Sequence, residues 1–193
     1  MERMRIIAGS ARGTHLKTPK GMSTRPTADR IKESLFSVLN SREVIAGSRV
    51  LDIFSGTGAL ALESLSRGAV SAAAIDKATG KLIKENAETT HLSEQLEVIN
   101  GDVAAALGRL IASGRCFDLI FSDPPYQKGL TEKVLDMIAD GGLLSDSGVI
   151  CAEVAAEEMI IPPAGLETVR ELSYGKTTKI LLLVKASGGK EET

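Results

Sequence analysis

Residues 49–58 read RVLDIFSGTG, in which a short apolar run leads into a loop with two glycines. The run at 49–53 predicts a buried strand, and the segment at 59–67, rich in alanine and leucine, predicts a helix that ends at Gly68. Glycines in such a strand-to-helix turn let the backbone bend tightly and approach a ligand closely. We therefore interpret the stretch as the ligand-binding turn of an α/β sheet. A purely structural turn is the alternative.

The rest of the chain repeats this alternation of strand and helix. Further buried strands are predicted at 71–76, 96–100, 117–122 and 149–154. The helices predicted between them lie at 79–91, 103–112 and 130–139. This order favours a mostly parallel sheet with helices on both faces, whose ligands bind beyond the carboxyl ends of the strands. Segments 167–174 and 177–185, separated by Gly175-Lys176, predict a hairpin at one edge of the sheet.

The N-terminal region differs from the rest of the chain in charge. Residues 1–32 carry eight basic and two acidic side chains, a net +6, so the remainder carries −8 of the chain's total of −2. Within this region, the glycines around Arg12 predict the tip of a loop, and Thr27 is the predicted N-cap of a helix. A basic arm on an acidic body indicates a polyanionic partner, the alternative being a solvated surface with clustered charges. We expect a basic arm and helix at 1–46, a main domain at 47–186 and a disordered tail at 187–193.

Acidic residues follow the predicted strands at the edge where ligands bind. Asp52 lies at the end of the first strand, Asp76 at the end of the second, and Asp102 follows the third. A carboxylate about 20 residues beyond the glycine loop is typical of a ribose contact, which fits Asp76, and Asp102 could accept from an adenine amino group. A nucleoside cofactor that lies across three strand ends explains these positions together. The predicted cofactor contacts are Asp52, Phe54, Ser55, Gly56, Thr57, Gly58, Asp76, Lys77, Asp102 and Val103.

The glycine loop alone does not distinguish a dinucleotide from S-adenosylmethionine. Asp52 places a negative charge at the loop, which disfavours a pyrophosphate and favours a ligand with a sulfonium and an ammonium group. No segment resembles a hydride-acceptor site. We therefore expect S-adenosylmethionine as the cofactor, and a nicotinamide-dependent oxidoreductase is the alternative.

A carboxylate, two prolines and an aromatic ring follow the strand at 117–122, as Asp123-Pro124-Pro125-Tyr126. Proline disfavours the helical conformation of the residue before it, so the Asp123 carboxylate and the Pro124 carbonyl are predicted to face outward as two acceptors. Two acceptors suit the two N–H bonds of an exocyclic amine, and a base could stack on Tyr126. These four residues are the candidate catalytic residues. An ordinary strand-to-loop turn is the alternative, because Asp and Pro are common turn residues.

The composition excludes several classes of protein. With 193 residues, 43% hydrophobic and 25% charged, the chain suits a single globular domain. Apolar runs stay shorter than the roughly 18 residues of a membrane span, and the start of the chain leads into no signal-peptide core, so we expect a cytoplasmic protein. We expect neither a disulfide framework nor a metal site, because the few candidate ligands are isolated: Cys116, Cys151, His15 and His91. A monomer is expected.

Four segments stand out together: the glycine loop at 52–58, the DPPY tetrapeptide at 123–126, RPTADR at 25–30 and YGKT at 174–177. With these segments the chain resembles one known family, the bacterial small-subunit ribosomal RNA guanine-N2 methyltransferases. DPPY is shared with other amino-methyltransferases, including those that act on adenine in DNA, whereas the RPTxDR segment is more specific. The resemblance extends from Met4 to Lys185. The chain departs from the family pattern at Asp76, where the family often has Glu, and at Lys176, where the family often has an acidic residue.

The resemblance implies a Rossmann-like, S-adenosylmethionine-dependent methyltransferase with a mostly parallel, seven-stranded sheet and an antiparallel last strand. The implied reaction is methylation of the exocyclic N2 amine of one guanine in the 16S rRNA of the small ribosomal subunit. The N-terminal arm would bind RNA, and Arg25 and Thr27 would close over the cofactor. The expected RNA contacts are Arg5, Arg12, Lys17, Lys20 and Arg25. A DNA adenine-N6 methyltransferase and a non-catalytic RNA-binding assembly factor are the alternatives.

Overall fold

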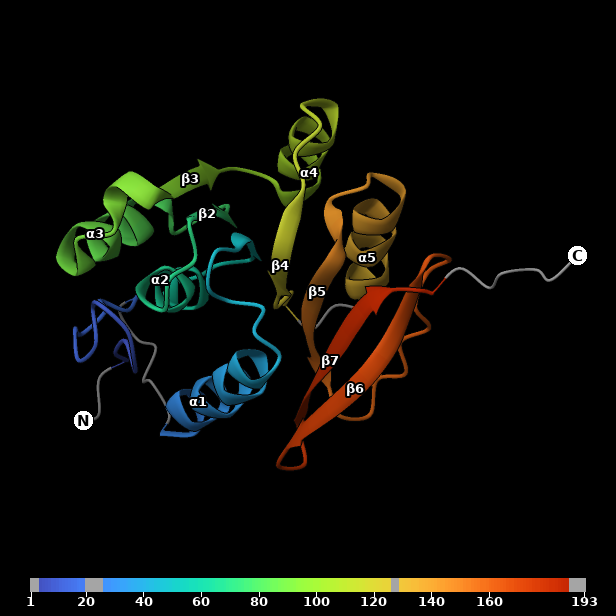
Figure 1. Cartoon of the computed structure of the whole chain (residues 1–193), viewed down its shortest axis with the longest axis horizontal. Helices are drawn as coiled ribbons and strands as arrows, with labels where there is room; N and C mark the ends of the chain where they lie inside the picture. The colour runs from blue at the N-terminus through green and yellow to red at the C-terminus, as the bar shows by residue number, and fades with distance from the viewer. Residues whose placement is uncertain (1–3, 20–25, 126–128, 188–193) are drawn as a thin grey trace, which may run out of the picture.

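The computed structural model describes residues 4–19, 26–125 and 129–187, which form a seven-stranded sheet in the order β3-β2-β1-β4-β5-β7-β6 (Figure 1). Neighbouring strands from β3 to β5 are parallel, and β7 runs antiparallel to both β5 and β6. The predicted α/β sheet with an antiparallel last strand is therefore confirmed. The strands are β1 (Arg49–Ile53), β2 (Ser71–Asp76), β3 (Leu96–Asn100), β4 (Phe117–Ser122), β5 (Leu144–Ala155), β6 (Leu166–Tyr174) and β7 (Thr178–Lys185).

Helices cover both faces of the sheet (Figure 1). The N-terminal arm, α1 (Pro26–Ser41), α2 (Ala59–Ser66) and α3 (Gly80–Thr90) pack on one face, and α4 (Val103–Ala112) and α5 (Leu130–Asp140) pack on the other. A short 3-10 turn at Ser93–Gln95 precedes β3. Within the described ranges, no helix has both the length and the apolarity that a membrane crossing requires.

The hydrophobic core lies in two layers, one on each side of the sheet. In β1, Val50 belongs to the layer under α1, α2 and α3, whereas Leu51 belongs to the layer under α4 and α5. Successive side chains of a strand point to opposite faces, so a strand covered on both faces must be apolar at nearly every position. This requirement explains why the central strands read as continuous apolar runs.

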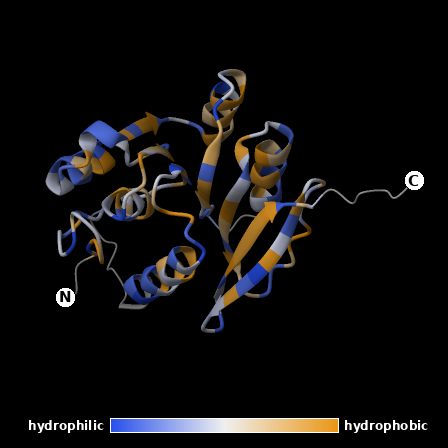
Figure 2. Ribbon diagram, in the orientation of Figure 1, coloured by the Kyte–Doolittle hydropathy of each residue, from blue (hydrophilic) through white to orange (hydrophobic). Residues whose placement is uncertain are grey.

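The edge strand β6 differs from its neighbour β7. Figure 2 shows β7 hydrophobic along most of its length, whereas β6 carries hydrophilic bands. Most side chains of β6 are exposed, among them Glu167, Arg170 and Glu171. Charged residues on an edge strand oppose pairing with a further strand from another molecule.

The N-terminal arm is anchored to α2 by a buried carboxylate. Glu63, with 0% of its surface exposed, accepts hydrogen bonds from the backbone N–H of Ile7 at 2.8 Å and of Ala8 at 3.1 Å. At Gly9 the two backbones come so close that an added Cβ would lie 1.7 Å from the carbonyl oxygen of Ser66. The arm is thus packed against the main domain.

One segment differs in detail from the sequence prediction, and the structure decides the conformation of another. The strand predicted at 149–154 begins earlier, at Leu144, because Leu144 pairs with Phe117 across a local irregularity of the β4–β5 ladder. The intervening residues 145–148 are polar and give no apolar pattern. In the arm, where the sequence allows a short hairpin or an irregular extended segment, one antiparallel bridge joins Arg5 and His15, and the Ile6 N–H donates to the Thr14 carbonyl beside it. The bounds of β1, β2 and β3 are as predicted.

Candidate functional site

The carboxyl ends of β1, β2, β4 and β5 meet where the strand order changes direction between β1 and β4. Two cavities lie there, of about 830 Å³ and about 660 Å³. We name the larger one the α5-side pocket, since Leu130 and Val134 of α5 line it, and the smaller one the α1-side pocket, since Ile31 and Leu35 of α1 line it. The residues that border both pockets are Phe54, Asp76, Ala78, Asp123 and Glu153.

Most predicted cofactor contacts in the described part of the chain line these two pockets. Asp52, Ser55, Gly56 and Thr57 line the α1-side pocket. Lys77, Asp102 and Val103 line the α5-side pocket, and Phe54 and Asp76 line both. The fold therefore brings residues from three separate strand-to-helix turns into one continuous site, as the prediction of a ligand across several strand ends requires.

Asp52, at the carboxyl end of β1, is a buried carboxylate beside the α1-side pocket, with 2% of its surface exposed. Its Oδ2 accepts hydrogen bonds from the Ser55 hydroxyl at 2.6 Å and from the Ala61 N–H at 3.2 Å. Burial raises the pKa of Asp52 to about 6, and the Asp76 carboxylate adds to the rise, while the two hydrogen bonds oppose it. A cation in the pocket would favour the ionised form of Asp52.

Asp52→Asn is expected to stabilise the ligand-free protein at neutral pH. The pKa of Asp52 is raised from 3.8 to about 6 in the folded state, so ionisation of this carboxylate favours unfolding. The destabilisation begins near pH 4, grows as the pH rises, and reaches its full size above pH 6. A rise of two pKa units corresponds to about 3 kcal/mol. Thermal unfolding should show the variant more stable than the wild type near pH 7.5 and nearly equal to it near pH 4. If the variant and the wild type were equally stable at both pH values, the ionised Asp52 carboxylate would not destabilise the folded protein.

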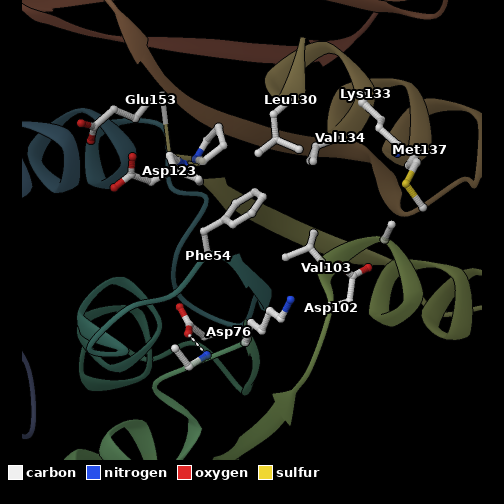
Figure 3. A pocket seen from close by; sticks show the side chains of 15 residues that line it. Phe54, Asp76, Asp102, Val103, Asp123, Leu130, Lys133, Val134, Met137 and Glu153 are labelled. Carbon is white, nitrogen blue, oxygen red and sulfur yellow. Dashed lines mark hydrogen bonds between the residues drawn. The ribbon is translucent and has the colours of Figure 1, made fainter. Parts of the chain in front are cut away.

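The glycine loop has three residues with left-handed backbone: Phe54 with φ 62°, Gly56 with φ 57° and Gly58 with φ 79°. This conformation is strained for an aromatic residue, and it directs the Phe54 ring into the pocket (Figure 3). A Cβ at Gly56 would meet no protein atom closer than 4.0 Å, so the loop is open toward a ligand there. A Cβ at Gly58 would lie 3.0 Å from Ile83 Cγ2, so Gly58 permits close packing of α3, and its contact with the cofactor stays a prediction.

Asp76, at the end of β2, organises the backbone around the pockets. Its Oδ2 accepts from the Gly56 N–H at 3.0 Å, and its Oδ1 accepts from the N–H groups of Ala78 at 2.8 Å and Thr79 at 2.9 Å. Burial alone would raise the pKa of Asp76, but these backbone hydrogen bonds lower it on balance. Asp76 therefore stays ionised at neutral pH, as a carboxylate that accepts from ribose hydroxyls should.

Asp102 is both a pocket residue and the N-cap of α4. Its Oδ1 accepts a hydrogen bond from the Ala105 N–H at 3.1 Å, which satisfies one of the free donors of the first turn. Asp102 is exposed and lies with Val103 on the wall of the α5-side pocket (Figure 3). The capping bond orients the side chain, and an adenine contact through it stays a prediction.

Asp123 and Glu153 lie side by side at the centre of the site. Ser122 of β4 pairs with Ala152 of β5 in the parallel ladder, so each acid follows its paired residue by one position. Figure 3 shows both carboxylates gathered at the same side of the pocket. Solvent still reaches the Asp123 side chain, yet the loss of hydration among surrounding protein atoms raises its pKa to about 7, and the carboxylates of Glu153 and Asp52 contribute.

Sequence reasoning missed Glu153. The residue lies within the apolar run 149–154, where a charged side chain is an exception to the pattern. A charge in a strand that is otherwise buried is a recognisable signal of a functional position. Its partnership with Asp123, however, depends on the pairing of β4 with β5, which are adjacent in the sheet but separated by α5 in the chain.

The remaining predicted residues lie at the periphery or outside the described part of the chain. Arg5 and Arg12 are exposed on the N-terminal arm, and Lys17 forms an ion pair with Glu85 at 2.8 Å. Pro124 is buried and Pro125 is exposed. Lys20, Arg25 and Tyr126 fall outside the described residues, as does the side chain of Thr27. In the described ranges, no group of three potential metal ligands is found.

Known proteins share this sequence and fold. Residues 4–183 match the family described as Conserved hypothetical protein 95. Ribosomal RNA small subunit methyltransferase D of Escherichia coli is 35% identical over 188 residues, which cover 96% of this chain and 92% of that protein. The protein of the same name from Haemophilus influenzae is 34% identical over 175 residues, 89% of each chain.

A solved structure agrees with these sequence relationships. The structure of the yhhF protein of Escherichia coli has a TM-score of 0.81 to this chain at 34% identity, and the likeness covers 96% of this chain and 100% of that one. The resemblance noted from the sequence is therefore confirmed: the chain belongs to the family described as Conserved hypothetical protein 95, to which it is joined by relatives named as small-subunit ribosomal RNA methyltransferases.

Proposed function

We propose that the protein transfers a methyl group from S-adenosylmethionine to the exocyclic N2 amine of a guanine in the 16S rRNA of the small ribosomal subunit. The observation that carries the proposal is the position of Asp123, whose side chain borders both pockets directly beyond a strand end. A group there can contact an amine in one pocket and a cofactor that extends into the other. Relatives named ribosomal RNA small subunit methyltransferase D support rRNA as the substrate.

The residues around the pockets fit S-adenosylmethionine in charge and in shape. Asp52 offers a carboxylate to a ligand whose sulfonium and ammonium groups are positive. Asp76 would hold the ribose, and Asp102 and Val103 the adenine, at the α5-side pocket. When bound, the cofactor supplies an electrophilic methyl group: the amine nitrogen bonds to its carbon while the carbon–sulfur bond breaks and the electron pair stays on sulfur.

The residues of the chain position the amine and remove its proton. Asp123 and the Pro124 carbonyl each accept one N–H of the guanine amine, which draws the nitrogen lone pair out of conjugation with the ring. Fixed placement of two reactants contributes about 7–11 kcal/mol in well-oriented systems. After transfer the nitrogen carries one proton too many and a positive charge. Asp123, or water beside it, accepts this proton and leaves a neutral methylamino group.

The N-terminal arm supplies positive charge for the RNA. Arg5 and Arg12 are exposed on the arm, which packs on α2 beside the glycine loop. Contacts of arginine with phosphates bind RNA without reading its sequence. Because they release counterions from the RNA, the affinity falls steeply as the salt concentration rises. The Lys17 ammonium is paired with Glu85, which lowers the attraction of Lys17 for RNA phosphates. Lys20 and Arg25 stay predicted RNA contacts.

The proposed substrate is tested by offering the enzyme three nucleic acids with labelled S-adenosylmethionine. They are small ribosomal subunits assembled from unmethylated RNA, the same RNA without proteins, and duplex DNA. Label in either RNA substrate is expected, and the better of the two identifies the natural form. Label in duplex DNA alone would replace the proposal with a DNA methyltransferase. Tight cofactor binding with no label in any of the three would favour a non-catalytic assembly factor.

The rate of transfer is expected to rise with pH through about 7. Asp123 can accept the proton of the amine only as a carboxylate, and the loss of hydration among surrounding protein atoms, together with the Glu153 and Asp52 charges, raises its pKa to about 7. The protonated form dominates below this pKa and cannot take the proton that the amine releases. Values of kcat/KM measured between about pH 5.5 and 8.5 report this ionisation in the free enzyme. A profile that is flat over this range would exclude Asp123 as the titrating acceptor.

A further inference from the structure

Glu153 is placed to contact the same substrate base as Asp123. The two residues follow the register pair of Ser122 and Ala152, so their backbones lie on neighbouring parallel strands about 4.8 Å apart. Both side chains border both pockets, and in Figure 3 their carboxylates are gathered at one side of the cavity. The glutamate is one methylene longer than the aspartate, so the two carboxylates can converge on adjacent atoms of one planar ligand.

The edge of guanine next to its exocyclic amine carries a further donor. The ring N1–H lies beside the N2 amine and points in nearly the same direction, so the edge presents a row of N–H donors. Two carboxylates are acceptor-only groups when ionised and match such a row. Adenine differs, since its ring N1 is an acceptor that a carboxylate would repel. The two carboxylates of Asp123 and Glu153 would therefore accept hydrogen bonds from a guanine edge and repel the N1 acceptor of an adenine edge.

We propose that Glu153 accepts the N1–H of the target guanine and is a specificity-determining residue, while Asp123 accepts from the amine that is methylated. This inference rests on the proposed function and deepens it, because it explains how one site selects guanine among bases that carry an exocyclic amine. Two adjacent carboxylates repel one another, as the effect of Glu153 on the Asp123 pKa indicates. Donors from a guanine edge would offset that repulsion.

The test compares guanine with 2-aminopurine at the methylated position. 2-Aminopurine keeps the exocyclic amine at C2, but its ring N1 is an acceptor and it lacks the O6 oxygen. The position is first located by mapping the methylated nucleoside in small-subunit RNA, and RNA with the analogue is prepared by ligation. The wild type should prefer guanine, and Glu153→Gln should reduce this preference about 10- to 100-fold, because its amide can donate to the analogue's N1. The loss of O6 affects both enzymes equally and cancels in the ratio.

Each outcome decides between the two claims. If the wild type does not methylate guanine N2, the proposed function fails, and this inference fails with it. If the wild type does so but Glu153→Gln keeps the same preference for guanine over 2-aminopurine, the inference alone is overturned. A folded Glu153→Gln that is inactive on both RNAs also overturns it, because the side chain is then needed irrespective of the base.

A second variant controls for a structural role. Glu153→Asp keeps the carboxylate but withdraws it by one methylene, so it should lose activity on guanine while still disfavouring 2-aminopurine. Thermal unfolding identifies variants that fail to fold. If Glu153→Gln does not fold, Glu153→Asp decides. A rate that falls more on guanine than on 2-aminopurine supports the inference, and an equal change on both bases, or no change on either, overturns it.

Discussion

Asp123→Ala is expected to abolish methyl transfer while S-adenosylmethionine binding stays within a few fold of the wild type. Asp123 borders both pockets, where we propose that it contacts the acceptor amine, whereas most of the proposed cofactor contacts come from the glycine loop, β2 and the start of α4. Loss of a positioned acceptor and proton-accepting group lowers rates on the order of 10²- to 10⁴-fold. Single-turnover rates with saturating RNA, together with calorimetric cofactor binding, separate the two effects.

Asp123→Asn provides the matched control for this variant. The amide keeps the size of the side chain and one carbonyl acceptor, but it has no charge and cannot take a proton. Its rate should therefore lie between those of the wild type and Asp123→Ala. Near-normal turnover in Asp123→Ala would show that the carboxylate takes no part in transfer. An equal loss of cofactor binding and of rate would assign Asp123 to the cofactor instead.

Glu63→Ala is expected to cause the largest loss of stability among these variants. The buried carboxylate accepts from two backbone N–H groups of the arm and forms ion pairs with Lys32 at 3.3 Å and Arg67 at 2.7 Å. Its removal leaves the buried Lys32 ammonium without this counter-ion, which typically costs about 3–5 kcal/mol, a large share of the roughly 5–15 kcal/mol by which a domain is stable. Urea unfolding of the two proteins measures the difference.

Asp146→Ala is the matched control, because it removes a carboxylate from an ion pair at the surface. Asp146 pairs with Lys185 at 2.7 Å, and 99% of its side chain is exposed. Exposed pairs contribute about 0–1 kcal/mol, so this variant should unfold at nearly the wild-type urea concentration. If Glu63→Ala were no less stable than Asp146→Ala, the arm would not depend on the buried carboxylate.

The sheet could be predicted from the sequence because each central strand is covered on both faces. Val50 and Leu51 must both be apolar for that reason, and the resulting run ends where the strand ends. The start of β5 could not be predicted, because residues 145–148 are polar and their extension is set by pairing with β4 rather than by their own pattern. The pattern of apolar residues along a segment predicts whether it is buried. It does not predict where a strand begins when pairing with a distant strand sets that point.

The residues of the candidate site were predictable only where they lie at or just beyond the ends of predicted strands. The glycine loop and Asp123 follow strand ends in the sequence, so their clustering follows from a parallel sheet. Glu153 was missed, since its importance comes from the register of β5 against β4. Gly58 stays a predicted cofactor contact, but the sequence could not show the packing reason for a glycine there, which is Ile83 of another helix.

The central claim is that the site holds a guanine amine against Asp123, and the identity of the methylated nucleoside tests it most directly. Small-subunit RNA labelled by the enzyme from S-adenosylmethionine is digested completely, and the nucleosides are separated beside authentic standards. All label should run with N2-methylguanosine, and none should appear in the Asp123→Ala reaction. Label in an adenosine, in a ring nitrogen or in a ribose would contradict the account.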